Sequence, residues 1–309
     1  MVEMTKVAHI FPGQGSQQVG MGHDLYDNFA VAKAVFDQAD EVLGFSLSRL
    51  CFEGPEDELR QTSNAQPALV TTSFACLQAA REVSGNDLPP PDFLAGHSLG
   101  EYTALAAGGV LDFATAVHLS RERGRLMHKA GQARPGGMVA VIELDEAPLT
   151  EVCRQTGTRI ANINCPGQIV ISGEQDNLTR ATELVKAKGA HRAIPLQVSG
   201  AFHTPLMQSA ADGMSEIVAT LDFQAPSVPI IGNTTAQPLT TARSVKAELL
   251  EQLCHCIQWQ RSIEYMAAQG VSTFIEIGPG RVLTGLIKRI NSEARLINIG
   301  DTEAIRSLV

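Results

Sequence analysis

Short apolar runs alternate along this chain with longer stretches in which apolar residues are spaced as on a helix. Buried strands are predicted at residues 7–11, 93–95 and 273–277, since each apolar run ends at a turn that contains glycine. Residues 30–50 and 68–83 have apolar positions at helical spacing. Such alternation predicts an α/β fold with a parallel sheet.

A boundary follows at Arg134-Pro135-Gly136-Gly137. Beyond it the predicted order is strand, helix, strand, strand, helix, strand, the ferredoxin-like arrangement, over residues 138–142, 146–155, 160–164, 168–172, 178–188 and 192–198. Residues 199–218 are then predicted as helix and residues 228–233 as strand. We expect a large α/β-hydrolase-like catalytic domain with a parallel sheet, formed by residues 1–134 and 200–309, and an inserted ferredoxin-like small subdomain at 135–199.

The segment Gly96-His97-Ser98-Leu99-Gly100 indicates a serine nucleophile on a sharp strand-to-helix turn. Gly96 and Gly100 lack the Cβ atoms that would collide in such a turn, and the helix N-terminus would direct N–H groups toward the serine oxygen. The alternative is an ordinary serine in a loop, because this five-residue pattern also arises by chance.

A serine hydroxyl needs a base to take its proton. His97 adjoins Ser98 but is expected to point away around the turn, whereas His203 lies where the chain leaves the predicted subdomain and re-enters the large domain. Crevices between domains favour binding sites, which supports His203 over the alternative of a histidine with a structural role in the core. Since an ordinary α/β-hydrolase places its histidine close to the C-terminus, the position of His203 indicates a different architecture.

Composition and charge narrow the class of protein. The 309 residues fit one large domain with an insertion or two domains, and 44% hydrophobic with 5% aromatic residues suits an α/β protein. A formal net charge of −9 argues against nucleic-acid binding. No stretch has the length of a membrane span or signal sequence, so we expect a cytoplasmic protein. The six cysteines lack the spacing of a zinc site or disulfide framework, and we expect neither a metal nor a cofactor.

Many ordered segments of the chain resemble the malonyl-CoA:acyl carrier protein transacylases, the acyltransferases of bacterial fatty-acid synthesis. The resemblance covers nearly the whole chain and rests on Phe11-Pro12-Gly13-Gln14-Gly15-Ser16-Gln17, Ala65-Gln66-Pro67-Ala68, Gly96-His97-Ser98-Leu99-Gly100-Glu101-Tyr102, Arg121-Glu122-Arg123-Gly124, Asn162-Ile163-Asn164-Cys165-Pro166-Gly167-Gln168, Gly200-Ala201-Phe202-His203, Gln252-Leu253 and Glu276-Ile277-Gly278-Pro279-Gly280.

This resemblance implies a Ser–His dyad. Ser98 would attack the malonyl thioester, and His203 would act as base and then as acid toward the departing thiol. The main-chain carbonyl of Gln252 would orient His203, and the backbone N–H groups of Gln14 and Leu99 would form the oxyanion hole.

The resemblance also implies substrate-binding residues. Arg123 would bind the free malonyl carboxylate through its rigid fork. Residue type alone favours the alternative of a solvated arginine on a basic helix face, and the Arg123-Gly124 context reverses this. Phe202 would fill the space that a branched acyl group needs, and Asn162 would bind substrate or serve as a turn residue. Family members commonly carry proline where this chain has Cys256, which leaves the geometry of the Gln252 loop open.

The implied function is a ping-pong transfer of malonyl from malonyl-CoA to acyl carrier protein, with CoA released and the chain acting as a monomer. Alternatives are an acyltransferase or proofreading hydrolase that serves a polyketide synthase, and a non-catalytic scaffold. The acidic carrier protein would need a basic surface to bind. The candidate residues are Lys186, Lys188, Arg192, Lys288 and Arg289. The alternative is that these residues are ordinary solvated surface.

Overall fold

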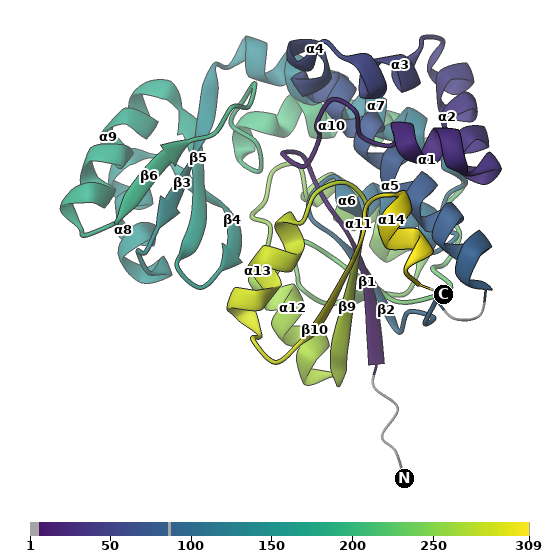
Figure 1. The fold of residues 1–309 in the computed structure, drawn as a ribbon. Helices are drawn as coiled ribbons and strands as arrows, with labels where there is room; N and C mark the ends of the chain where they lie inside the picture. The colour runs from purple at the N-terminus through teal and green to yellow at the C-terminus, as the bar shows by residue number, and fades with distance from the viewer. Residues whose placement is uncertain (1–5, 86–87, 309) are drawn as a thin grey trace.

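The computed structural model of the protein describes residues 6–85 and 88–308. It contains two β-sheets (Figure 1). The larger sheet has the order β10-β9-β1-β2-β7-β8 and is parallel except for β8 at its edge. Its strands are β1 (Lys6–Phe11), β2 (Phe93–Gly96), β7 (Ile230–Ile231), β8 (Pro238–Leu239), β9 (Val271–Ile277) and β10 (Arg295–Ile299). Residues 1–5, 86–87 and 309 of the predicted large domain lie outside the described residues.

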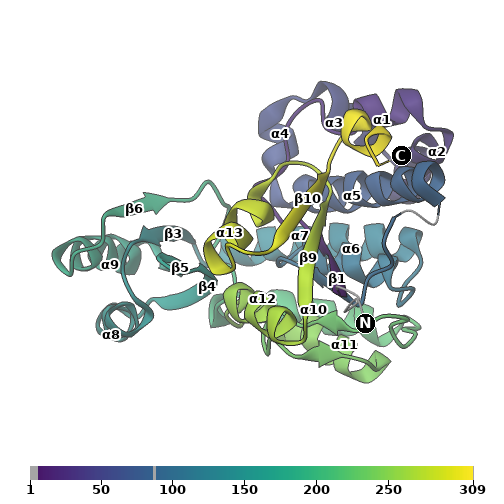
Figure 2. The same ribbon diagram turned by 60° about the horizontal axis from the view of Figure 1, so that its bottom comes forward.

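Helices cover both faces of this sheet because its central strand is apolar on both sides. Val7 and Phe11 of β1 pack among residues of α5 (Thr62–Ser84), α6 (Gly100–Ala107) and α7 (Phe113–Ala133). Ala8 and Ile10, on the opposite side of β1, pack with α12 (Trp259–Ala268) and α13 (Val282–Ile290). Figure 2 shows α12 and α13 beside β9 and β10, with α5, α6 and α7 on the other side.

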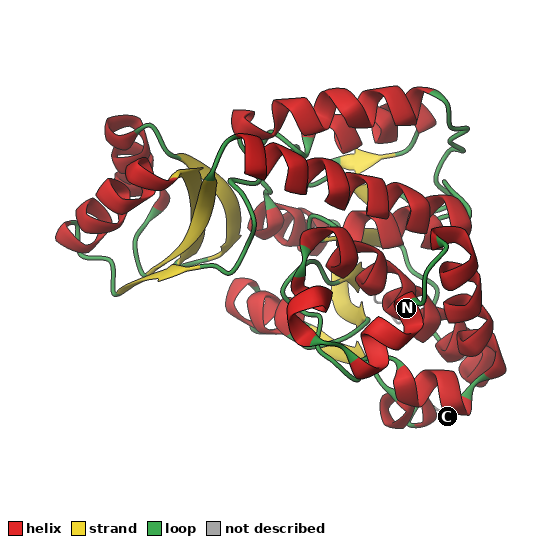
Figure 3. Ribbon diagram, turned by 90° about the horizontal axis from the view of Figure 1, so that it is seen from above, coloured by secondary structure: helices red, strands yellow, loops and turns green. Residues whose placement is uncertain are grey.

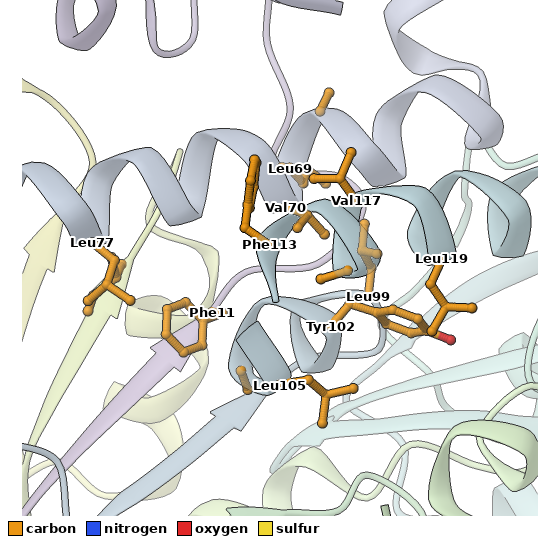
Figure 4. Packing of buried hydrophobic residues seen from close by; sticks show 14 of the residues in the cluster. Phe11, Leu69, Val70, Leu77, Leu99, Tyr102, Leu105, Phe113, Val117 and Leu119 are labelled. Carbon is orange, nitrogen blue, oxygen red and sulfur yellow. The ribbon is translucent and has the colours of Figure 1, made fainter. Parts of the chain in front are cut away.

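The core beneath α6 holds the start of that helix in place. Figure 4 shows Leu99, Tyr102 and Leu105 among apolar side chains that include Val70 of α5 and Val117 of α7. All five side chains are at most 1% exposed. The turn before α6 is therefore anchored by close packing on its inner side.

The remaining helices are α1 (His23–Asn28), α2 (Ala30–Leu43), α3 (Leu47–Glu53), α4 (Glu56–Arg60), α10 (Gln208–Ala219), α11 (Ala242–Glu251), α14 (Thr302–Arg306) and the 3₁₀ turn η2 (Pro205–Met207). The single helix predicted at 30–50 is wrong, because Gly44 adopts φ 70° and separates α2 from α3. The helix predicted from residue 199 begins only at Gln208, since Thr204 precedes a proline and is extended. Within the described residues, no helix has the length and apolar character needed to cross a membrane.

A second, antiparallel sheet of order β4-β5-β3-β6 stands to one side (Figure 1, left; Figure 3). Its elements follow the predicted order: β3 (Gly136–Ile142), α8 (Glu146–Thr156), β4 (Arg159–Cys165), β5 (Gln168–Glu174), α9 (Gln175–Ala187) and β6 (Arg192–Pro195). The strand predicted to reach residue 198 ends at Pro195, although the N–H of Leu196 still donates to Met138 O of β3 at 2.9 Å. Ile257 of the large part pairs with β4, its N–H donating to Ala161 O at 2.8 Å and its oxygen accepting from Ile163 N–H at 2.8 Å.

Candidate active site

Ser98 lies on a sharp turn between β2 and α6, with φ 50°. Two close backbone approaches make this turn possible. A Cβ on Gly96 would lie 1.9 Å from the carbonyl carbon of Gly100, and a Cβ on Gly100 would lie 2.1 Å from the oxygen of Phe11. Both positions therefore require glycine, and they fix Ser98 beside the end of β1.

Asn233, two residues after the end of β7, holds the turn in place. Its Oδ1 accepts from the N–H of Ser98 at 2.7 Å, and its Nδ2 donates to the oxygen of Gly96 at 2.7 Å. Sequence reasoning gave Asn233 no role. The available signal was its place directly after a buried strand, where polar residues of a parallel sheet gather around ligands.

His203 is the basic group nearest the Ser98 hydroxyl. Its Nε2 lies 2.9 Å from Ser98 Oγ, and its Nδ1 lies 2.7 Å from the main-chain oxygen of Gln252. Because a carbonyl can only accept, Nδ1 carries the proton and Nε2 is free to accept from the serine O–H. Burial, together with the charge of Arg123, lowers the pKa of His203 to about 3. The arrangement can thus remove the Ser98 proton with a neutral imidazole.

Arg123 places a buried guanidinium against the same oxygen. Its Nη2 donates to Ser98 Oγ at 3.1 Å and to Gln252 Oε1 at 2.7 Å, while Nη1 donates to Gln66 Oε1 at 2.8 Å. Arg123 is 1% exposed, which excludes the alternative of a solvated helix face. Burial lowers the pKa of Arg123, but a guanidinium keeps its charge. Gln66, which sequence reasoning overlooked, lies on α5 and faces α7.

The loop after β1 brings Gln14 to the cavity that Ser98 lines. The loop after β1 reaches the turn because Phe11 pairs with Gly96, and a Cβ on Gly13 would lie 2.3 Å from the oxygen of His97. Across the described residues, the N–H groups of Gln14 and Leu99 have no hydrogen-bond acceptor. Such free donors suit an oxygen that gains negative charge.

These groups surround a cavity of about 80 Å³. It brings together most of the predicted site residues, and its lining consists of Gln14, His97, Ser98, Arg123, Met127, Met138, Asn162, Leu196, Val198, Phe202 and His203. Gln252 lies behind the histidine, and Leu99 is the residue just before α6. Asn162 is 9% exposed, and its Oδ1 has no partner within the described part of the chain.

The cavity adjoins larger spaces, and two of these share Gln14 with it. One of about 210 Å³ shares Gln14 and Asn162 with it and extends between the small sheet and α13. The other, of about 360 Å³, shares Gln14 and Leu196 with it and extends toward α4. A long substrate could therefore reach Ser98 from the surface along the junction of the two sheets.

His97 and the cysteines take other positions. Nε2 of His97 lies 2.9 Å from Asn164 Oδ1, so this ring is engaged away from Ser98 Oγ. All six cysteines are free, and the described residues contain no group of three His, Cys, Asp or Glu side chains suited to a metal. With Cys256 at the family's usual proline position, Gln252 still directs its oxygen at His203.

Residues 8–300 match the family described as acyl transferase domain. A malonyl CoA-acyl carrier protein transacylase of Bacillus subtilis is 47% identical over 307 residues, or 98% of this chain and 96% of that protein. An acyl carrier protein S-malonyltransferase structure from Vibrio cholerae has TM-score 0.94 and 42% identity, covering 99% of this chain and 100% of that one. A structure of a malonyl-transacylase in complex with its type II PKS acyl-carrier protein is also similar, with TM-score 0.94, 39% identity and coverage of 98% and 99%.

Proposed function

The chain belongs to the malonyl CoA-acyl carrier protein transacylases of the acyl transferase family, and we propose that it transfers malonyl from malonyl-CoA to the phosphopantetheine thiol of acyl carrier protein in fatty-acid synthesis. The observation that carries this proposal is the buried Arg123 guanidinium 3.1 Å from Ser98 Oγ. A malonyl group on Ser98 would have its carboxylate a short distance from the ester carbonyl, within reach of that cation. Bacterial relatives of this chain bear the corresponding name.

The first half-reaction forms the malonyl-Ser98 ester. His203 Nε2 takes the Ser98 proton as Oγ attacks the thioester carbonyl, and the resulting oxyanion is held by the N–H groups of Gln14 and Leu99. When the tetrahedral intermediate collapses, the C–S bond breaks and His203 gives its proton to the CoA sulfur. Gln252 O holds Nδ1 of the imidazole at 2.7 Å throughout.

The second half-reaction reverses these roles. His203 takes the proton of the carrier-protein thiol, whose sulfur attacks the ester, and returns the proton to Ser98 Oγ as the C–O bond breaks. CoA must leave before the carrier thiol enters the same cavity, which makes the mechanism ping-pong. Asn162 Oδ1, buried without a partner, would accept from an amide N–H of the pantetheine arm.

Size and charge would select the acyl group. Phe202 is 5% exposed and lines the small cavity, so a branched acyl group would meet its ring. Arg123 would favour a carboxylate over a simple acyl group, because the empty guanidinium loses hydration without gaining a partner.

The domain division, location and partner surface are part of the proposal. The antiparallel order β4-β5-β3-β6 supports a ferredoxin-like subdomain at 135–199, inserted into an α/β-hydrolase-like domain of residues 1–134 and 200–309. One chain supplies every group of the cavity, so a monomer would suffice. Free thiols suit a cytoplasmic location. Lys288 and Arg289 lie in the last turn of α13, where Arg289 donates to Gln168 of the small sheet at 3.3 Å, and would meet an acidic carrier protein.

A second candidate is a malonyltransferase that serves a polyketide synthase, favoured by the similar structure with a type II PKS acyl-carrier protein. A proofreading hydrolase for simple acyl groups would have no use for Arg123 as a carboxylate clamp.

Intact-protein mass spectrometry after addition of malonyl-CoA tests the proposal. A stable adduct on the parent chain that is absent from Ser98→Ala supports a transferase. Rapid hydrolysis of the adduct would indicate the proofreading enzyme, and no adduct on a folded parent chain would indicate a scaffold. Side-by-side transfer to fatty-acid and polyketide carrier proteins then separates the two transferase functions.

A further inference from the structure

Glu101 is a fully buried carboxyl group next to the site that the proposed mechanism does not use. It lies in the first turn of α6, three residues after Ser98, and is 0% exposed. One oxygen, Oε2, accepts a hydrogen bond from Nε2 of Gln252. The other, Oε1, has no partner among residues 6–85 and 88–308. Burial of a carboxyl group disfavours the folded state unless its neighbours compensate.

The amide of Gln252 has a different partner for each of its groups. Oε1 accepts from Arg123 Nη2 at 2.7 Å, while Nε2 donates to the oxygen of Ser98 at 3.0 Å and to Glu101. If this amide were turned by 180°, its NH₂ would face the guanidinium. Because an arginine only donates hydrogen bonds, that contact would be repulsive.

We propose that Glu101 is a positioning residue that fixes the Gln252 amide with its oxygen toward Arg123, and so sets the preference for an acyl group that carries a carboxylate. Nη2 of Arg123 is shared between Gln252 Oε1 and Ser98 Oγ. Without the acceptor at Glu101, Nε2 of Gln252 keeps only the Ser98 oxygen, so the amide is held less firmly and so is the guanidinium that it supports beside the serine. The inference rests on the proposed function, in which Arg123 binds the malonyl carboxylate.

The positioning role needs an acceptor at residue 101 and no charge. Burial, with the nearby carboxyl of Glu248, raises the pKa of Glu101 well above its usual value, while Arg123 and the Gln252 amide act against this. A protonated carboxyl still has an oxygen that accepts from Nε2 of Gln252. A glutamine at position 101 also offers such an oxygen at nearly the same place, whereas a methionine of similar size does not.

The test compares the single-turnover acylation rates with malonyl-CoA and acetyl-CoA. Glu101→Gln should keep the malonyl-to-acetyl ratio within about threefold of the parent. Glu101→Met should lower the ratio by about 10- to 100-fold, the size of a lost hydrogen bond to a charged group. Glu276→Gln, which changes a buried carboxylate that caps α13, should lower the melting temperature and leave the ratio unchanged.

A folded Glu101→Met with the parent ratio would overturn the inference, and so would a Glu101→Gln ratio as low as that of Glu101→Met. If Glu101→Met does not fold, Gln252→Met takes its place, because it removes the amide and keeps the main-chain oxygen that faces His203. An unchanged ratio there overturns the inference equally. Failure of the proposed function is distinct: the parent would form no malonyl adduct, or Arg123→Ala would keep the parent ratio.

Discussion

The main-chain oxygen of Gln252 faces Nδ1 of His203 at 2.7 Å, in the place where many serine enzymes have a carboxylate. A carboxylate there would stabilise the imidazolium and raise the histidine pKa, whereas a carbonyl orients the ring without adding charge. With Arg123 close by, a neutral acceptor leaves His203 uncharged and ready to accept a proton from Ser98.

The pH dependence of acylation should reflect the low pKa of His203. Since that pKa is about 3, the imidazole stays neutral as the pH falls through 6.5, and kcat/KM for acylation should show no inflection there. Arg123→Ala removes a positive charge that lowers this pKa, so its inflection should lie at higher pH than in the parent. Stopped-flow release of CoA between pH 4 and 8 should show a flat profile for the parent, and it shows whether the inflection of Arg123→Ala has moved up into this range. An inflection near 6.5 in the parent chain would contradict the expectation.

The lowered pKa of His203 should also make the stability of the folded chain fall as the pH falls. The unfolded chain binds a proton at His203 near pH 6.5, and the folded chain does so only near pH 3. The contribution of neutral His203 to stability is thus complete above about pH 6.5 and is lost as the pH falls toward 3. His203→Gln should therefore lose less stability than the parent over that range, as measured by urea unfolding at each pH. Parallel losses in both proteins would contradict the prediction.

Replacement of His203, the proposed base, should slow acylation of Ser98. His203→Ala should reduce the rate of acylation by about 10²- to 10⁴-fold, the usual contribution of a positioned acid–base group. His255→Ala is the matched control, because His255 is 59% exposed and pairs with Glu251 on the surface. Near-normal acylation in His203→Ala would place the base elsewhere.

Arg123→Ala should reverse or abolish the preference for malonyl. Loss of one partner of a buried, hydrogen-bonded ion pair lowers kcat/KM by roughly 30- to several-thousand-fold, while acetyl transfer should stay level or rise. Arg123→Lys should recover only part of the loss, since an ammonium lacks the planar fork. Arg125→Ala, on the exposed side of the same helix, is the control. Equal losses with malonyl-CoA and acetyl-CoA would make Arg123 a structural residue.

Gly13→Ala should impair the oxyanion hole. The new Cβ would lie 2.3 Å from the oxygen of His97, so the loop must move and take the N–H of Gln14 with it. We expect the acylation rate to fall by at least about 10²-fold, the usual effect of losing one such donor. Gly285→Ala is the control, since its Cβ would meet no atom within 4 Å. Comparable rates in the two variants would show that the loop is not part of the hole.

The order of elements and the serine turn could be predicted because both depend on residues that are close together in the sequence. Gly96 and Gly100 predict a close turn, and short apolar runs that end at turns predict the strands. Asn233 could not be found in this way, since it contacts Ser98 across 135 positions of sequence. Gln66 and Glu101 lie in segments that carry the family resemblance, but their contacts could not be predicted because their partners lie on other elements. Local pattern also failed at residue 44, where glycine at positive φ ended a helix whose apolar spacing continued.

The backbone conformations of Ser98 and His203 lower the stability of the folded chain at the residues proposed to carry its activity. Four non-glycine residues of the described chain have positive φ, and the nucleophile and the base are two of them, at 50° and 59°. Each such residue disfavours the folded state by about 1–3 kcal/mol. The two residues that carry the proposed chemistry therefore lie where the backbone is least favourable, and the packing and hydrogen bonds around them must hold them there.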